Sequence, residues 1–254
     1  MIPREISFLF FRWQTYSAAI LLALLITCLW LIWRAPAGQR RVTGDVLLAG
    51  LLGGVLLARV GHVWLCWAYF KDHQAEIIQL SAGGLDWHGA FFGALMASAA
   101  VAYWRKLDHG TLLSRISFAV PLIGKATWVG CAAVGCAYGA EVAHLYDYPA
   151  GMAWIGPDIY GLEAARFNVQ GLGALAALIL LAIALMLQWR GWLIRTRFWL
   201  ILLMWSLVVF SLGFLRGDHA EMAYSLRQDQ WLDVATALFA FLMIWVALLR
   251  RSSA

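Results

Sequence analysis

Seven long apolar stretches, separated by short polar connections, dominate the pattern of this sequence. They lie near residues 16–33, 46–69, 88–104, 117–138, 169–188, 198–215 and 231–249. Each is close to the roughly 20 residues that an α-helix needs to cross the hydrocarbon core of a bilayer. The pattern therefore predicts an all-α, polytopic membrane protein with about seven transmembrane helices.

The basic residues predict the orientation of these spans. Eleven of the 19 lysines and arginines fall on one side of the bilayer if the spans alternate: Arg34, Arg40, Arg41, Arg105, Lys106, Arg115, Arg190, Arg195, Arg197, Arg250 and Arg251. The other side, formed by the N-terminus and the connections at 70–87, 139–168 and 216–230, carries most of the acidic residues. The positive-inside rule then places the N-terminus outside and the C-terminus inside. The first apolar stretch is expected to stay in place as an anchored helix, because further spans follow it and no small-residue cleavage site does.

Composition supports a membrane protein and argues against a nucleic-acid partner. Hydrophobic residues make up 63% of the chain and charged residues 13%, against roughly 45–50% and about 25% in soluble domains. The apolar stretches are evenly spread without a linker, which indicates a single membrane domain over residues 1–254. The net charge of +5 follows from the topology, so no nucleic-acid partner is expected.

Two further features concern the predicted outer face. The connection at 139–168 contains Trp154, Ile155 and Pro157, which favour a small cap that packs on the membrane surface. Cys131 and Cys136 are five residues apart in an apolar run, a spacing that points two side chains to different faces of a helix. We therefore expect neither a disulfide nor a zinc site.

Three residues within or beside the spans are candidates for chemistry. Arg59 lies deep in the second span, where it can anchor a lipid phosphate or pair with a buried acid; a structural ion pair or snorkelling to water is an equal alternative. Lys125 has the same alternatives and snorkels more readily. His88 begins the third span and can act as a general base, while Gly89 and Gly93 permit close approach of a helix or a lipid. Taken alone, a structural histidine and plain helix packing are the commoner explanations.

The order and spacing of these segments resemble the prolipoprotein diacylglyceryl transferase family. The resemblance covers nearly the whole chain. The matching segments are Thr15–Tyr16, Ala58–His62, Glu76–Ile77, Gly83–Gly89, Gly130–Gly139, Arg166 with Gln170, Phe214–Asp218, Ser225 and Gln230–Trp231.

The resemblance implies a fold, a reaction and a location. It implies seven transmembrane helices with a small periplasmic head in the bacterial inner membrane, with the active face on the periplasmic side. Phosphatidylglycerol enters from the outer leaflet, and the lipobox cysteine thiol of a prolipoprotein signal peptide attacks its glyceryl carbon and expels glycerol phosphate. No metal or other cofactor is implied.

The same resemblance implies roles for individual residues. His88 is the candidate base, Tyr16 a groove hydroxyl and Arg216 a contact to the phosphate that leaves; the substrate-binding candidates are Arg59, Lys125, Gly139 and Arg166.

Five positions depart from the family pattern. Two arginines and a glutamate of the family are replaced by Trp128, Val209 and Gly213, and an asparagine and a glutamate by Cys131 and Cys136. Losing cations at a site that expels phosphate removes electrostatic stabilisation, and a lysine such as Lys125 lacks the bidentate fork of arginine. Three hypotheses follow: a divergent transferase, a transferase of the same chemistry with another acceptor, and a non-catalytic lipid-binding scaffold within a larger membrane complex. A channel or transporter is disfavoured, because the spans lack paired acids.

Overall fold

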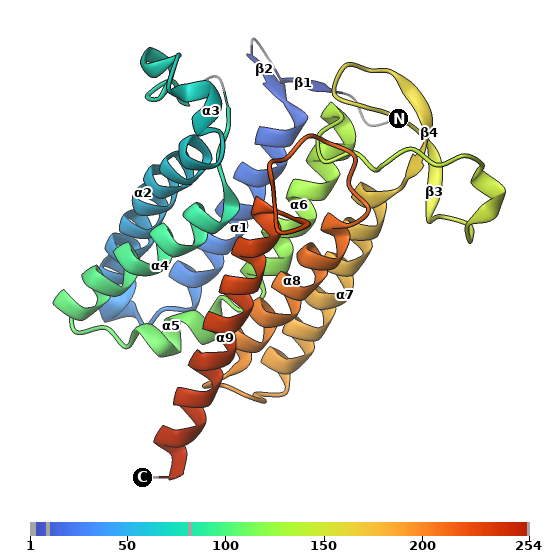
Figure 1. Cartoon of the computed structure of the whole chain (residues 1–254). Helices are drawn as coiled ribbons and strands as arrows, with labels where there is room; N and C mark the ends of the chain where they lie inside the picture. The colour runs from blue at the N-terminus through green and yellow to red at the C-terminus, as the bar shows by residue number, and fades with distance from the viewer. Residues whose placement is uncertain (1–3, 9–10, 81–82, 253–254) are drawn as a thin grey trace. The chain divides into compact units, whose positions relative to one another are not determined.

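The apolar stretches fold into seven long helices. The computed structural model describes residues 4–8, 11–80 and 83–252. Within them the long helices are α1 (Thr15–Arg34), α2 (Arg40–Leu65), α4 (Trp87–Trp104), α6 (Ala119–Val134), α7 (Val169–Trp189), α8 (Arg197–Gly213) and α9 (Gln228–Ser252) (Figure 1). Two short helices, α3 (Trp67–Phe70) and α5 (His109–Arg115), lie in the connections. All seven stretches predicted to be helical are helical.

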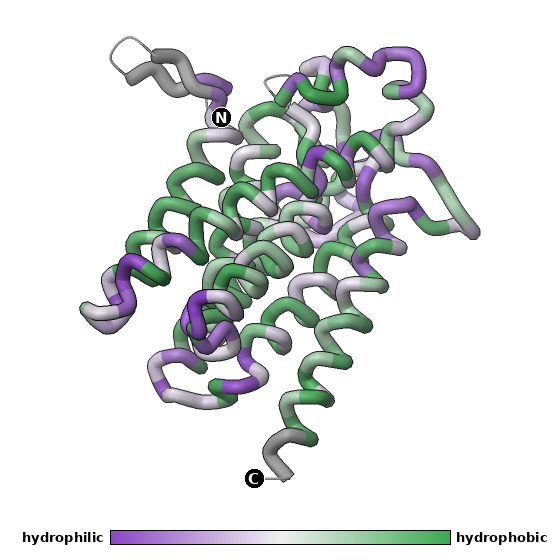
Figure 2. Tube along the Cα trace, turned by 90° about the vertical axis from the view of Figure 1, so that its left-hand side faces the viewer, coloured by the Kyte–Doolittle hydropathy of each residue, from purple (hydrophilic) through white to green (hydrophobic). Residues whose placement is uncertain are grey.

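Several of these helices are long and apolar enough to cross a membrane. Four qualify, namely α1, residues 37–65, α7 and α9, and a bent pair formed by α5 and α6 would make a fifth. In the four helices only 17–33% of the apolar window is buried, so large apolar side chains need lipid around them. Figure 2 shows the helices largely hydrophobic, with hydrophilic residues gathered at their ends and in the connections. The chain is a multi-pass membrane protein, while the count of seven spans and their orientation stay predictions.

The chain forms two compact units, each assembled from separate parts of the sequence. Unit 1 consists of Met1–Thr27, Ser114–Ala220 and Asp233–Ala254, and unit 2 of Cys28–Leu113 and Glu221–Leu232. The single membrane domain over residues 1–254 stays a prediction.

Unit 2 is organised by tight packing of α2 against α4. A Cβ atom on Gly93 would lie 2.2 Å from the carbonyl oxygen of Gly53, and one on Gly89 would lie 2.2 Å from that of Leu57. The two helices therefore run antiparallel with their backbones in contact, as small residues permit. The close approach expected at Gly89 and Gly93 is confirmed, and the neighbour is α2.

Unit 1 is built around α6, α7 and α8, where tryptophan rings pack over glycines. The ring of Trp205 fills the space over Gly124, and that of Trp128 fills the space over Gly173. Arg197, only 4% exposed, donates hydrogen bonds to the carbonyl and hydroxyl oxygens of Ser114 and to the hydroxyl of Ser117. This buried cation is thus satisfied within the unit.

Three short hairpins correct the all-α prediction. They are β1 (Glu5–Phe8) with β2 (Phe11–Gln14), β3 (Ala153–Pro157) with β4 (Glu163–Phe167), and β5 (Met222–Ala223) with β6 (Leu226–Arg227), all antiparallel. The β3–β4 hairpin forms most of the regular secondary structure in the 139–168 segment. Its turn is held by Asp158, whose Oδ1 accepts hydrogen bonds from the backbone of Tyr160 and Leu162, a local pairing typical of aspartate in turns.

Candidate active site

The candidate residues divide between the two units. His88 and Arg59 belong to unit 2, whereas unit 1 contains Tyr16, Lys125, Gly139, Arg166 and Arg216. Among the described residues, no group of three or more His, Cys, Asp or Glu side chains is arranged to hold a metal ion.

In unit 2, His88 is oriented by the residue that caps its own helix. Asp86 is the N-cap of α4: its Oδ2 accepts a hydrogen bond from the backbone of Gly89 at 2.7 Å, and its Oδ1 lies 3.1 Å from Nδ1 of His88. The imidazole is 2% exposed and packs against the ring of Trp87, with centroids 4.0 Å apart. When Nδ1 carries the proton that bonds Asp86, Nε2 is the nitrogen that can accept a proton. This is the arrangement of a general base with a carboxylate that fixes its tautomer.

Sequence reasoning placed His88 at the start of this helix but missed the role of Asp86. The signal was available, because aspartate directly before an apolar helical run is a common N-cap. The backbone N–H of Asp86 also donates to the carbonyl of Ala58 at 3.0 Å. The cap, and with it the histidine, is therefore tied to α2.

Arg59 uses its guanidinium to hold backbone rather than a carboxylate. Its Nε donates to the carbonyl of Ile77, Nη2 to that of Glu76, and Nη1 to those of Gly83 and Gly84, at distances of 2.6–3.1 Å. The side chain is 7% exposed, and its guanidinium carbon lies 5.2 Å from the centroid of the Phe70 ring. Of the alternatives that the sequence left open, neither an ion pair nor snorkelling describes this arrangement. Arg59 fastens the connection that leads into α4.

In unit 1, Tyr16 lies directly against the small-residue end of α6. A Cβ atom on Gly130 would fall 2.7 Å from Cα of Tyr16 and 2.9 Å from its ring. Gly130 is thus required for α1 to come this close. Tyr16 is half-buried and lies beside Gly130, the residue that precedes Cys131.

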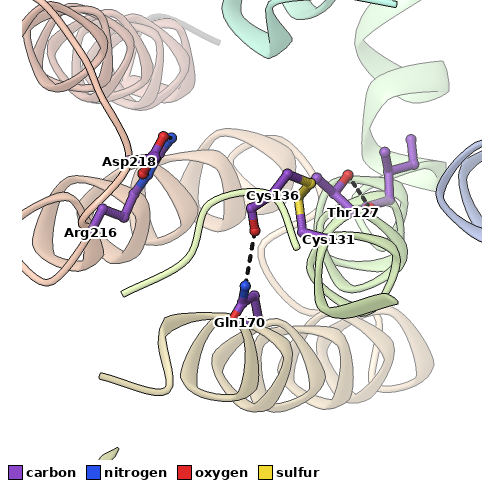
Figure 3. The surroundings of a disulfide bond; sticks show 7 residues. Thr127, Cys131, Cys136, Gln170, Arg216 and Asp218 are labelled. Atoms are coloured by element: carbon purple, nitrogen blue, oxygen red, sulfur yellow. Dashed lines mark hydrogen bonds and ion pairs between the residues drawn. A yellow bond between two sulfur atoms is a disulfide. The ribbon is translucent and has the colours of Figure 1, made fainter. Parts of the chain in front are cut away.

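The prediction that Cys131 and Cys136 do not pair is wrong, because they form a disulfide (Figure 3). The prediction assumed that both lie on one continuous helix. In fact α6 ends at Val134, and Gly135 adopts a left-handed conformation with φ 81° that turns the chain back. This brings the two Cα atoms to 4.6 Å, within disulfide range.

Gly139 and Arg216 belong to adjoining segments of unit 1. They form an isolated antiparallel bridge, and a Cβ atom on Gly139 would lie 2.0 Å from the carbonyl oxygen of Phe167. The guanidinium of Arg216 is paired with Asp218, with Nε 2.8 Å from Oδ1 and Nη2 2.5 Å from Oδ2 (Figure 3). Gly139 is thus a point of close backbone approach, and the Arg216 cation has a carboxylate partner.

Arg166 is buried within the 139–168 segment. Its Nη2 lies 2.9 Å from Glu141 and 3.6 Å from Asp158, and its guanidinium carbon lies 5.0 Å from the centroid of the Tyr138 ring. The residue is 6% exposed, and its Nε has no hydrogen-bond partner in the described part of the chain. An anion that displaced the exposed Glu141 carboxylate would find a desolvated cation here.

The remaining positions lie along α6 and α8. Lys125 is half-buried and makes no hydrogen bond or ion pair to another described residue. Trp128 is 5% exposed, and its ring packs over Gly173. Val209 and Gly213 lie in α8, half-buried and buried respectively.

Comparison with known proteins gives one family. The family model for prolipoprotein diacylglyceryl transferase matches residues 3–246. The phosphatidylglycerol–prolipoprotein diacylglyceryl transferase of Acinetobacter baumannii is 28% identical over 249 residues, which is 91% of this chain and 87% of that protein. The enzymes of the same name from Nitrosospira multiformis and Aromatoleum aromaticum are 31% and 46% identical over 124 and 54 residues, or 48% and 21% of this chain.

These last two matches span 40% and 20% of the relatives' own lengths. The whole-chain match of the family model nevertheless confirms the resemblance drawn from the motifs and, with it, the expectation of an enzyme of the transferase class. The chain belongs to the prolipoprotein diacylglyceryl transferase family.

Proposed function

We propose that this protein transfers the diacylglyceryl group of phosphatidylglycerol to the lipobox cysteine of prolipoproteins, at the outer face of the bacterial inner membrane. The observation that carries the proposal is the Asp86–His88 pair, a buried imidazole held by a carboxylate at 3.1 Å, in a chain that matches the family over residues 3–246. The relatives named above carry this activity in their names. The comparisons do not favour the scaffold alternative, and a larger membrane complex is not part of the proposal.

In the proposed reaction the peptide thiol loses its proton to Nε2 of His88. The sulfur attacks the glyceryl carbon, a C–S bond forms, the C–O bond to phosphate breaks, and glycerol phosphate leaves. A base contributes to such a step when its proton-accepting nitrogen is held in place. Asp86 supplies that orientation.

Cations are needed where the phosphate leaves. Arg216 is assigned this role, with Arg166 and Lys125 as further contacts to the lipid phosphate and Tyr16 as a hydroxyl donor. Exchange of the Asp218 carboxylate for phosphate would let Arg216 keep a bidentate partner. Gly139 keeps the segments that bear Arg166 and Arg216 in contact. Arg59 contributes to the site by fixing the connection before His88.

The proposal includes seven spans with the N-terminus outside, the C-terminus inside and the 139–168 segment as a periplasmic cap. The distribution of basic residues supports it. The disulfide at the Gly135 end of α6 adds support, because disulfides persist in the periplasm and are rare in the cytosol.

The test is transfer of radiolabelled diacylglyceryl from phosphatidylglycerol to a lipobox peptide by the full-length protein in detergent. We expect label on the peptide with the wild type and a loss on the order of 10²–10⁴-fold with His88→Ala. His144→Ala is the matched control, since His144 is exposed and lies outside the site. Full activity of His88→Ala would remove the histidine from the mechanism, and no transfer by folded wild type would refute the proposed function.

A further inference from the structure

The disulfide between Cys131 and Cys136 contributes little that the backbone does not already provide. The N–H groups of Gly135 and Cys136 both donate to the carbonyl of Cys131, at 2.8 and 3.1 Å. The turn is thus closed by hydrogen bonds as well as by sulfur. The covalent ring spans a sequence separation of five, and the stabilisation from a disulfide is smallest for the shortest loops. Stability alone is therefore a weak reason for these two sulfurs to be here.

The two sulfurs lie in different environments. Cys131 is 6% exposed in the last turn of α6, whereas Cys136 is half-buried beyond the end of that helix. An incoming thiolate therefore meets Cys136 first. A partly exposed cysteine joined to a buried one suits exchange with a dithiol, because the partly exposed sulfur forms the mixed disulfide and the buried sulfur is the leaving group.

A hydrogen bond from α7 holds the backbone at Cys136. Gln170, in the first turn of α7 and 3% exposed, donates its Nε2 to the carbonyl of Cys136 at 2.9 Å (Figure 3). The backbone on both sides of the disulfide is thus held in place, by α6 at Cys131 and by α7 at Cys136.

We propose that Cys131–Cys136 is a thiol–disulfide exchange site for peptide dithiols outside the cytoplasm. A peptide thiolate attacks Sγ of Cys136, the bond between the two cysteines breaks, and Cys131 leaves as a thiolate and takes up a proton. The second thiol of the peptide then attacks the mixed disulfide and releases Cys136. The peptide loses two electrons and becomes a disulfide, and the pair in the protein becomes a dithiol. This activity does not depend on diacylglyceryl transfer.

A redox titration of the full-length protein tests the proposal without altering the pair. Cys28 and Cys66, the free cysteines of the described chain, are replaced by alanine, and the protein in detergent is equilibrated with glutathione buffers before thiols are counted with a maleimide of added mass. We expect the pair to pass from oxidised to reduced within the range of these buffers, whereas a structural disulfide resists them. A pair that stays oxidised in every buffer overturns the proposal.

Trapping of a fluorescent peptide with a single cysteine compares the reactivity of the two sulfurs. Its mixed disulfide with glutathione is offered to Cys131→Ala and to Cys136→Ala in the same background. We expect Cys131→Ala, which keeps Cys136, to be labelled about ten-fold faster than Cys136→Ala. Equal rates, or no labelling of either, overturn the proposal, and if a variant fails to fold, the titration of the intact pair decides.

A transfer assay on the same preparation separates this inference from the proposed function. Transfer without exchange overturns only the exchange site, and exchange without transfer overturns only the transferase. The transfer assay and the exchange measurements both use protein shown to be folded by gel filtration and thermal unfolding.

Discussion

Three candidate arginines, Arg59 of unit 2 and Arg166 and Arg216 of unit 1, are held in different ways. In unit 2, four backbone carbonyls accept from the guanidinium of Arg59. In unit 1, carboxylates pair with Arg166 and Arg216. A carbonyl-held arginine cannot change partner without releasing the chain it fastens, whereas a carboxylate-held arginine can exchange one anion for another. From this difference we expect a structural task for Arg59 and anion binding at Arg166 and Arg216.

The largest effect expected from this comparison is on stability at Arg59. Arg59→Ala should lower the free energy of unfolding by about 3–5 kcal/mol, because it removes four hydrogen bonds from a charged donor to carbonyls of the connection. Thermal unfolding in detergent measures this. Arg105→Ala is the matched control: its ion pair with Asp45 is more than half exposed on the arginine side, so about 1 kcal/mol or less is expected. Equal losses in the two variants would contradict the structural task of Arg59.

In unit 1 the corresponding structural test is Gly139→Ala. The added Cβ would lie 2.0 Å from the carbonyl oxygen of Phe167, so the contact of the two segments must open. We expect a loss of about 2–3 kcal/mol together with a fall in transfer activity. Gly151→Ser offers a contrast, because no atom lies within 4 Å of a Cβ there; its cost should come from the positive φ of 88° alone. Normal stability of Gly139→Ala would show that the segments can separate without cost.

A smaller effect, confined to substrate binding, is expected at Arg216. Arg216→Lys keeps the charge but loses the bidentate fork that now binds Asp218. The KM for phosphatidylglycerol should rise roughly ten-fold, with the unfolding temperature little changed. Measurement of transfer against lipid concentration decides the point. A variant that loses stability instead would make Arg216 resemble Arg59, and the distinction between these arginines would fail.

The smallest effect concerns a carboxylate of unit 2 and appears as a pH dependence. A hydrogen bond from the hydroxyl of Thr111, aided by the backbone of Gly110, lowers the pKa of Asp108 below its ordinary value. A lowered pKa in the folded state contributes stability above the ordinary pKa of aspartate and loses it as the pH falls through the folded value. Thr111→Val should therefore be slightly less stable than wild type at pH 7, and the gap should close in acid. If the difference in stability between wild type and Thr111→Val did not depend on pH, it would come from side-chain packing and not from the hydrogen bond to Asp108.

Local patterns were enough to predict most of the helices and one part of the site. Each long apolar run is helical, because a chain in a bilayer must satisfy its backbone internally. His88 was expected at the start of a helix and lies there. The partner of His88 was missed because Asp86 was not considered as a helix cap, although that signal is local.

Longer-range arrangements were not visible in the pattern. The carbonyl partners of Arg59 lie 17–25 residues away along the chain, and no spacing rule connects a cation to backbone oxygens. The β3–β4 hairpin has five-residue strands, too short to show an alternation distinct from its surroundings.

The sequence by itself determined a multi-pass helical chain of this family, because apolar length, glycine spacing and motif order are properties of neighbouring residues. Only the tertiary structure decided that Cys131 and Cys136 are joined, that Arg59 holds backbone, and that carboxylates hold Arg166 and Arg216. The physical reason is common to all three. Each depends on where a helix ends or a connection folds back, and the turn at Gly135 and the docking of residues 76–77 and 83–84 are fixed by contacts across the fold.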